Sequence, residues 1–228
     1  MIIIPAYNES ENILSVIENI KRNASQCDYI VINDCSHDDT EQICLNNNIP
    51  VISLPVNLGI GGAVQTGYKY AFYNNYDAAI QVDGDGQHDA KYIERMLNTL
   101  KKENCDMVIG SRYIDREGFQ SSVIRRIGIR YFSWLIRLLT RQKITDPTSG
   151  FRACNRKVIE VFSEKYPFDF PEPEVIVQLA KQKSKTQEVS VKMYERQGGK
   201  SSITPIKSMY YMYKVTIGIL FAATEKTK

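Results

Sequence analysis

The sequence lacks the features that would assign it to a specialised class. Its five cysteines are spread along the chain with no C-x-x-C pair, which argues against a disulfide framework and a zinc site. No run of about 18 apolar residues is present, as a membrane-spanning helix would require, and the apolar start of the chain has no basic region or cleavage site of a signal peptide. The net charge of +3 is too small to indicate a nucleic-acid partner. The composition is that of a globular protein with reduced thiols, as in the cytosol.

Short β-branched segments alternate with longer helical ones through the first half of the chain. The strand-like segments are 1–4, 29–34, 51–55, 78–83 and 106–113, and the helical ones between them are 10–24, 39–47, 61–75 and 91–103. Near-continuous apolar strands that alternate with amphipathic helices are typical of a parallel sheet covered on both faces. The sequence therefore predicts an α/β fold, Rossmann-like, with a mostly parallel sheet and helices on both faces.

A polar segment follows each predicted strand at its carboxyl end. These segments are PAYNE at 5–9, NDCSHDD at 33–39, Asn57 with the glycines that follow it, DGDGQHD at 83–89 and GSRY at 110–113. Each one alone could be an ordinary turn, because Asn, Asp and Gly are common in turns. Parallel strands bring their carboxyl ends to one edge of the sheet, where such folds bind ligands. We therefore expect the five segments to form one binding site.

Asp83, Asp85 and Gln87 stand at alternate positions of the fourth segment, which begins with a D-x-D motif. Hard divalent cations take oxygen ligands, and a cation that also binds substrate phosphates needs only one or two protein carboxylates. Gly84 would let a bulky anionic ligand approach the backbone. A metal held on a phosphate and a plain turn are the two interpretations. An EF-hand calcium loop is excluded, because Gln87 and His88 stand where it needs Asp or Asn and then glycine.

Two glycine-rich segments resemble nucleotide-binding motifs but fail at a required position. GIGGAV ends in Val64, where the dinucleotide motif needs glycine, and YERQGGKS begins with Tyr194, where the P-loop needs glycine. The sequence therefore predicts neither a dinucleotide cofactor nor ATP held in a P-loop.

The second half of the chain is organised differently, with a predicted amphipathic helix at 121–142, helices at 155–164 and 170–184, and a strand at 187–195. In the first of these helices the basic residues fall within about 60° of arc, and the apolar residues cluster on another face; the basic residues are Arg126, Arg130, Arg137 and Arg141. A cationic stripe beside aromatic residues suits a helix that lies at a membrane surface. The alternative is a helix that packs through its apolar face, with its arginines in water.

Seven segments occur in the order and spacing of a known family: IIIPAYNESENI, VINDCSHDDT, NLGIGGAVQTGYKYA, QVDGDGQHD, GSRY, DPTSGFRA and ERQGGKSSI. Through them the chain resembles glycosyltransferase family 2, and within it the branch of dolichyl-phosphate mannose synthase and bacterial polyprenyl-phosphate glycosyltransferases. The resemblance implies a GT-A fold and an inverting, metal-dependent hexosyltransferase of cell-envelope glycan synthesis. It covers a catalytic domain at 1–203, which leaves an amphipathic tail at 204–228 that could associate with a membrane.

The resemblance also implies roles for individual residues. It places a nucleotide pocket at Pro5, Ala6, Tyr7, Glu9, Ile32, Asp34 and Gly84. It assigns Mg²⁺ or Mn²⁺ to Asp83, Asp85 and Gln87. One departure concerns the second motif, where the family commonly has two acidic residues and this chain has Asn33 before Asp34. Asp34 alone is therefore expected to contact the base or ribose.

The acceptor is open between two chemistries. A lipid phosphate is already anionic and needs cations to position it, and the candidates are Arg112, Arg125, Arg126 and Arg196, with Ser201 beside them. A sugar hydroxyl of a lipid-linked or capsular saccharide needs a general base, and the candidates are Asp146, Glu172 and Glu174. Asp146 could instead form only a turn, and the two glutamates could stabilise the start of a helix. The arginines favour a polyprenyl phosphate.

The expected partners follow from this interpretation. They are a UDP- or GDP-linked sugar, a lipid-linked acceptor and the inner face of the cell membrane, approached peripherally from the cytoplasm; no nucleic acid is expected, and the oligomeric state is open. Two other classes remain. A sugar nucleotidyltransferase would show a glycine-rich basic loop after its first strand, where this chain has the acidic PAYNESEN. A non-catalytic nucleotide-sugar binding module would need no acceptor residues.

Overall fold

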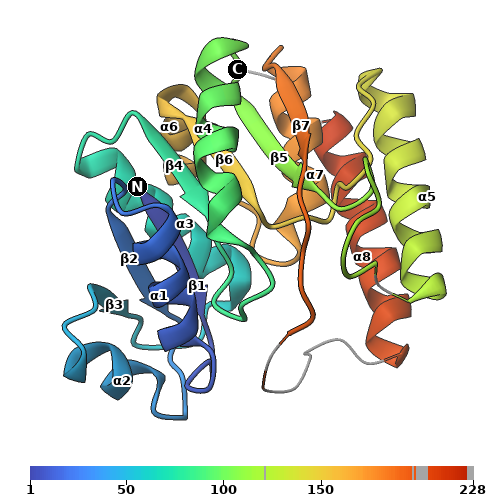
Figure 1. Ribbon diagram of the computed structural model, residues 1–228. Coiled ribbons are helices and arrows are strands. Elements are labelled where there is room, and N and C mark those ends of the chain that lie inside the picture. The colour runs from blue at the N-terminus through green and yellow to red at the C-terminus, as the bar shows by residue number, and fades with distance from the viewer. Residues whose placement is uncertain (121, 197, 199–204, 225–228) are drawn as a thin grey trace.

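The computed structural model describes residues 1–228 except 121, 197, 199–204 and 225–228, and for residues 205–209 it describes the backbone alone (Figure 1). The strands are β1 (Ile2–Ala6), β2 (Tyr29–Asn33), β3 (Val51–Ser53), β4 (Ala78–Gln81), β5 (Met107–Ser111), β6 (Arg152–Asn155) and β7 (Thr186–Ser190). The helices are α1 (Ile13–Asn23), α2 (Thr40–Asn46), α3 (Gly59–Tyr73), α4 (Ile93–Lys102), α5 (Val123–Thr140), α6 (Arg156–Glu164), α7 (Pro171–Lys181) and α8 (Pro205–Thr224), with a 3₁₀ turn at Ala90–Tyr92 before α4. The strand–helix alternation expected for the first half is confirmed.

The seven strands form one mixed sheet in the order β3-β2-β1-β4-β6-β5-β7. The neighbours β2 and β3, β1 and β2, β1 and β4, and β5 and β7 are parallel, so the expected mostly parallel sheet is confirmed. β6 runs antiparallel to both of its neighbours, β4 and β5. The sequence analysis missed this strand, because Arg-Ala-Cys-Asn has neither β-branched residues nor an apolar alternation. It forms a strand because its backbone pairs with the buried strands β4 and β5 on either side.

Helices cover both faces of the sheet, as expected. α1, α2 and α4 contribute to a core cluster on one face, together with strand residues such as Ile4 and Val108. α3 and the helices α5 to α8 contribute to the cluster on the other face, together with residues such as Ile3 and Ile109. Alternate side chains of one strand are therefore buried on opposite faces of the sheet. Because both faces are buried, the strand sequences are continuous apolar runs.

α5 lies at the edge of the molecule beside α8 (Figure 1). Ser122 caps its first turn by accepting a hydrogen bond from the backbone N–H of Arg125, and Arg141 ends it in the left-handed conformation. The side chains that hold α5 to the core are Ile129, Phe132, Leu135 and Ile136. Most of the apolar stripe expected from the sequence faces outward instead: Ile124 is 79% exposed, Ile127 60% and Leu138 63%.

α8 packs against α7 and α5. Val215, Ile219 and Ala222 are buried in the same core cluster as the inner residues of α5 and α7. Among the described residues, no helix is long and apolar enough to cross a membrane. The division into a catalytic domain and a C-terminal tail stays a prediction.

The start of α3 is fixed by a close approach of the segment between α6 and α7. The backbone N–H of Gly61 donates to the carbonyl of Phe168 at 3.0 Å. A Cβ at Gly61 would lie 2.0 Å from the carbonyl oxygen of Pro167 and 2.3 Å from that of Phe168. Only glycine leaves room for this backbone contact.

Gly61→Ala should therefore destabilise the protein, by about 1–3 kcal/mol, since the added methyl group forces the 167–168 backbone away from α3. Urea unfolding measures the difference. Lys69→Ala, an exposed change in the same helix, serves as the control and should stay within about 0.5 kcal/mol of the parent. Equal stability of parent and Gly61→Ala would contradict the close contact.

Candidate functional site

A pocket of about 570 Å³ lies at the carboxyl ends of β1, β2 and β4. The predicted residues that line it are Pro5, Ala6, Tyr7, Glu9, Asp34, Asp83, Gly84, Asp85 and Arg196. The convergence of the polar segments at one edge is thus observed for the first four of them, since Asn57 and Gly59 of the third segment also line the pocket. Ile32 does not line the pocket, because its side chain is fully buried in the core below.

The remaining lining residues come from two places. One is the start of α3, where Asn57 and Gly59 belong to the third predicted segment and Ile60 and Ala63 were not expected. The other is the segment before α7, with Asp169 and Phe170, which was not predicted. Nothing in the local sequence marks Asp169, since only packing against α3 brings its segment to the pocket.

Asp34 joins the end of β2 to the start of α3. Its carboxylate accepts the backbone N–H of Leu58 at 2.7 Å, and its carbonyl accepts the side-chain amide of Asn57 at 3.1 Å. Burial raises the pKa of Asp34, against the effect of the hydrogen bonds from Leu58 and Gly59. The residue is therefore held in one orientation beside the pocket.

Arg196 crosses from the segment after β7 to the first motif. Its guanidinium contacts a Glu9 oxygen at 2.7 Å and lies 3.9 Å from a carboxylate oxygen of Asp85. Asn12 donates to the other oxygen of Glu9 at 2.8 Å. Burial raises the pKa of Glu9, and the contacts with Asn12 and Arg196 oppose that rise. Ser201, expected near Arg196, lies outside the described residues.

The pocket is rich in carboxylates. Among the described residues that line it, five are acidic and one is basic, namely Glu9, Asp34, Asp83, Asp85 and Asp169 against Arg196. A diphosphate entering such a pocket would meet net negative charge, so it needs a cation to accompany it. Among the described residues, no group of three or more acidic, histidine or cysteine side chains could hold a metal by itself. The residues therefore fit a divalent cation that is shared with the phosphates of a ligand.

The D-x-D segment has the donors for such a cation. Gln81 donates to Asp83 at 2.8 Å. Gln87, the third predicted ligand, is not among the lining residues, and its side chain donates to the carbonyl of Tyr194 at 3.3 Å. Burial and the neighbouring charge of Asp83 raise the pKa of Asp85. Two half-buried carboxylates that repel each other are an arrangement that a divalent cation relieves.

His88 supports this segment from below. Its Nδ1 accepts the backbone N–H of Asp83 at 3.0 Å, and its ring stacks on Phe151 at a centroid distance of 4.8 Å. The sequence analysis treated His88 as part of the loop only. Its position within the D-x-D segment was the available signal, and the stacking partner, 63 positions further along the chain, was not visible.

Arg112 and Asp146 form a buried ion pair. Arg112 Nε donates to one Asp146 oxygen at 2.7 Å and Nη2 to the other at 2.8 Å. The Asp146 side chain is fully buried. Glu188 accepts the backbone N–H groups of Thr145 and Asp146 at 2.8 and 2.9 Å and so fixes this loop. Both Asp146 oxygens are occupied, so the geometry favours orienting Arg112 over accepting a proton from a substrate.

The two candidate glutamates differ in their surroundings. Glu174 accepts a hydrogen bond from Gln178 at 3.0 Å, and a Cβ at Gly218 of α8 would lie 2.7 Å from its other oxygen. It therefore packs between helices. Burial raises the pKa of Glu172, and the charges of Arg152 and Arg125 oppose the rise. The positive charges of Arg152 and Arg125 thus act on Glu172.

Arg152 was not singled out from the sequence. It is fully buried, donates to the carbonyls of Ser149 and Pro147 at 2.7 and 2.9 Å, and has no hydrogen-bond partner for Nη1 among the described residues. The DPTSGFR segment therefore presents a buried positive charge near Glu172.

Neighbouring arginines of α5 reach different places. The charge of Arg125 acts on Glu172 and on Tyr211. Arg126 lines a second pocket of about 360 Å³, which shares no lining residue with the first. Successive residues of a helix point about 100° apart, so the structure does not bring Arg126 to Arg196.

Comparison with known proteins gives consistent matches. The family model described as "Glycosyl transferase family 2" matches residues 1–162. A UDP-N-acetylglucosamine–dolichyl-phosphate N-acetylglucosaminyltransferase of Methanococcus voltae is 29% identical over 182 residues, which are 72% of this chain and 72% of that protein. An undecaprenyl-phosphate mannosyltransferase of Micrococcus luteus is 25% identical over 214 residues, 89% of this chain and 86% of that protein.

A solved structure has the same fold. The glucosyl-3-phosphoglycerate synthase from Mycobacterium tuberculosis, in complex with Mn²⁺, UDP-glucose and phosphoglyceric acid, superposes with a TM-score of 0.73 at 19% identity. The match covers 100% of this chain and 80% of that chain. The likeness shows the fold, which is the GT-A type expected from the sequence.

Asp146→Asn should destabilise the fold by about 3–5 kcal/mol, since it leaves the buried Arg112 guanidinium without its counter-charge. Denaturant unfolding measures the loss. Asp115→Asn makes the same chemical change at an exposed site and should stay within about 0.5 kcal/mol of the parent. A loss of activity in Asp146→Asn without loss of stability would instead indicate a direct part in the reaction.

Asp85→Asn should stabilise the metal-free protein at neutral pH. The raised pKa of Asp85 means that its ionised form is less favourable in the folded than in the unfolded state. In EDTA the Tm of the variant should exceed that of the parent at about pH 7. The gap should close as the pH falls toward about 4, where aspartate becomes protonated. Asp77→Asn, an exposed change, should show no gap, and a lower Tm for Asp85→Asn at neutral pH would oppose this account.

Proposed function

Since the chain belongs to glycosyl transferase family 2, whose model matches well over half of its 228 residues, we propose that it transfers a sugar from a nucleoside diphosphate sugar to a polyprenyl phosphate. The observation that carries the proposal is the acid-rich pocket in which Asp83 and Asp85 lie with Arg196 at the strand ends. Such a pocket suits a diphosphate that arrives with a divalent cation. The reaction would serve cell-envelope glycan synthesis.

The donor would lie along the pocket from β2 to β4. Tyr7, Glu9 and Asp34 line the side of the pocket that we assign to the base and ribose, and Gly84 lines it beside the end of β1, where the diphosphate would lie. UDP is the first choice for the nucleotide and GDP the second, because the similar solved structure contains UDP-glucose.

Asp83, Asp85 and Gln87 would hold Mg²⁺ or Mn²⁺ between the protein and the diphosphate. When bound, a divalent cation neutralises the negative charge that develops on the leaving diphosphate. Gln81 and His88 keep the Asp83 carboxylate and backbone in place, through the hydrogen bonds given above. Arg196, held by Glu9, adds a fixed positive charge 3.9 Å from Asp85.

A phosphate acceptor agrees with the positions of the arginines. An oxygen of the acceptor phosphate forms the bond to the anomeric carbon while the bond to the diphosphate breaks, and the electron pair leaves with the diphosphate. Direct displacement of this kind inverts the anomeric carbon. Arg125 and Arg196 are the cations we assign to the acceptor phosphate, and Arg112 has its orientation set by Asp146. The names of the relatives from Methanococcus voltae and Micrococcus luteus support a lipid phosphate.

The rival acceptor is a sugar hydroxyl of a lipid-linked or capsular saccharide. Such an acceptor needs a base, and Glu172 is the carboxylate whose surroundings suit one, because burial raises its pKa. A polyprenyl acceptor would also bring the protein to the inner face of the membrane from the cytoplasm. The exposed apolar stripe of α5 supports that peripheral contact.

A transfer assay decides between these functions. Labelled UDP- or GDP-sugar is incubated with Mn²⁺ and either polyprenyl phosphate or a lipid-linked saccharide, and the products are separated. Asp85→Ala should abolish turnover and keep the fold, because the raised pKa of Asp85 means that its ionised carboxylate does not stabilise the folded state. Charge reversal at Arg125 should lower transfer to polyprenyl phosphate strongly while nucleotide binding, read by thermal shift, survives. Glu172→Gln should lower the rate of transfer by less than the 10²–10⁴-fold that is typical of a lost general base.

The opposite ranking identifies the rival. Transfer to the saccharide alone would move the assignment to the hydroxyl acceptor. Glu172→Gln would then lower the rate of transfer strongly, and charge reversal at Arg125 would lower it little. Formation of a nucleotide sugar from a sugar phosphate would identify a nucleotidyltransferase. Nucleotide-sugar binding without any transfer would leave a binding module.

A further inference from the structure

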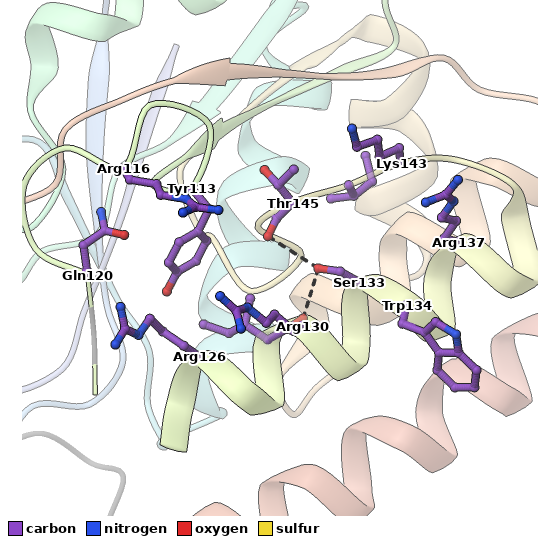
Figure 2. A pocket seen from close by; sticks show the side chains of 12 residues that line it. Tyr113, Arg116, Gln120, Arg126, Arg130, Ser133, Trp134, Arg137, Lys143 and Thr145 are labelled. Carbon is purple, nitrogen blue, oxygen red and sulfur yellow. Dashed lines mark hydrogen bonds between the residues drawn. The ribbon is translucent and has the colours of Figure 1, made fainter. Parts of the chain in front are cut away.

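The second pocket is lined by twelve side chains from the segment after β5, from α5 and from the segment before Asp146 (Figure 2). Among these described residues five are basic and none is acidic, and the basic ones are Arg116, Arg126, Arg130, Arg137 and Lys143. Among the described residues, no ion pair joins any of the five to a carboxylate. Five cations around about 360 Å³ give the pocket a positive potential that attracts an anion.

The pocket also holds a hydrogen-bonding group without a partner. The hydroxyl of Tyr113 is buried and makes no hydrogen bond among the described residues. Figure 2 shows its ring directed toward α5, where Arg126 and Arg130 project. A buried hydroxyl without a hydrogen-bond partner is costly, and the oxygen of an anion in the pocket could accept a hydrogen bond from it.

An exposed apolar stripe lies directly beside these cations on α5. At about 100° per residue, Val123, Ile124, Ile127, Trp134 and Leu138 fall within about 100° of arc, and Arg130 and Arg137 border that arc on one side. Trp134, which is 59% exposed, also lines the pocket. The stripe therefore continues into the rim of the basic pocket.

α8 extends the apolar surface. Thr216 of α8 lies 3.4 Å from the hydroxyl of Tyr131 on α5, which places the two helices side by side there. One turn to either side of Thr216, Tyr213 is 68% exposed and Leu220 is 45% exposed. Two adjacent helices thus both expose aromatic and aliphatic side chains.

We propose that the basic pocket binds the phosphate-bearing headgroup of an anionic phospholipid, while the exposed stripe of α5 lies in the membrane interface. A free anion would leave the apolar stripe in water, and an apolar partner would leave the cations unpaired. An anionic lipid surface satisfies both. The site goes beyond the proposed transfer reaction, because it shares no lining residue with the pocket of Asp83 and needs neither donor nor acceptor.

Vesicle binding of the full chain tests the site without any transfer. The protein is sedimented with vesicles of phosphatidylcholine alone and of phosphatidylcholine with phosphatidylglycerol. The chain has one tryptophan, Trp134, so its fluorescence reports on this face alone. Strong binding to the anionic vesicles only, with a shift of the Trp134 emission to shorter wavelength, is the expected result.

The variant for the pocket is Arg130→Glu with Arg137→Glu, two exposed positions of α5. Its binding to anionic vesicles should fall by about tenfold or more, because each basic residue at an anionic surface contributes roughly fivefold. The matched control is Lys21→Glu with Lys102→Glu, which makes the same change of charge at exposed positions of α1 and α4, on the opposite face of the sheet. It should bind within about twofold of the parent. Melting temperature and nucleotide-induced thermal shift should be unchanged in both.

Several outcomes would overturn the proposal. These are no preference for anionic vesicles, binding without a change in Trp134 emission, and equal losses in the two double variants. A Trp134 response to inorganic phosphate together with no vesicle binding would indicate a soluble anion, and a response to an acidic peptide alone would indicate a protein partner. None of these readouts depends on sugar transfer, so failure of the transfer assay and failure of this site are distinguishable.

Discussion

The site depends on how tightly the ends of three parallel strands are held together. The N–H of Asp34 donates to the carbonyl of Ala6 at 2.9 Å, and the N–H of Gly84 donates to that of Pro5 at 3.2 Å. A side chain at Gly84 would bring its Cβ within 3.0 Å of the Pro5 oxygen. Because β2 and β4 flank β1 at this spacing, the acidic groups that follow each strand share one pocket.

The protein has two pockets whose lining residues carry charges of opposite sign. The pocket at the strand ends gathers carboxylates around one arginine, so an anionic ligand requires a cation there. The pocket beside α5 is lined by five cations and, in the part of the chain that the structure describes, by no carboxylate. The ion pair of Arg112 and Asp146 lies in the loops between them and is rigid because Glu188 holds the loop backbone. An acceptor held by Arg125 would meet the donor between these regions.

Much of the fold and part of the site could be predicted from local patterns. Strand–helix alternation located the elements around β1 to β5, and the D-x-D segment located Asp83 and Asp85. β6 was not predicted, because its residues have no strand signature and form a strand only by pairing with β4 and β5. Asp169 was not predicted for a similar reason, since only the backbone contact of Gly61 with Phe168 brings its segment to the pocket. Both depend on contacts between segments that lie far apart in the chain.

The sequence by itself determined the family resemblance, the class of fold and the identity of the acidic pocket, because these follow from periodicity and from residue types at fixed spacing. Only the tertiary structure decided what each candidate side chain can do. Asp146 is neutralised by Arg112, a partner 34 positions earlier in the chain. Arg125 and Arg126 are neighbours in sequence, yet helix rotation sends their charges to different places. The apolar stripe of α5 faces outward because other residues of the helix fill the core. Which neighbours each side chain meets depends on how distant segments pack together, and local sequence does not contain that information.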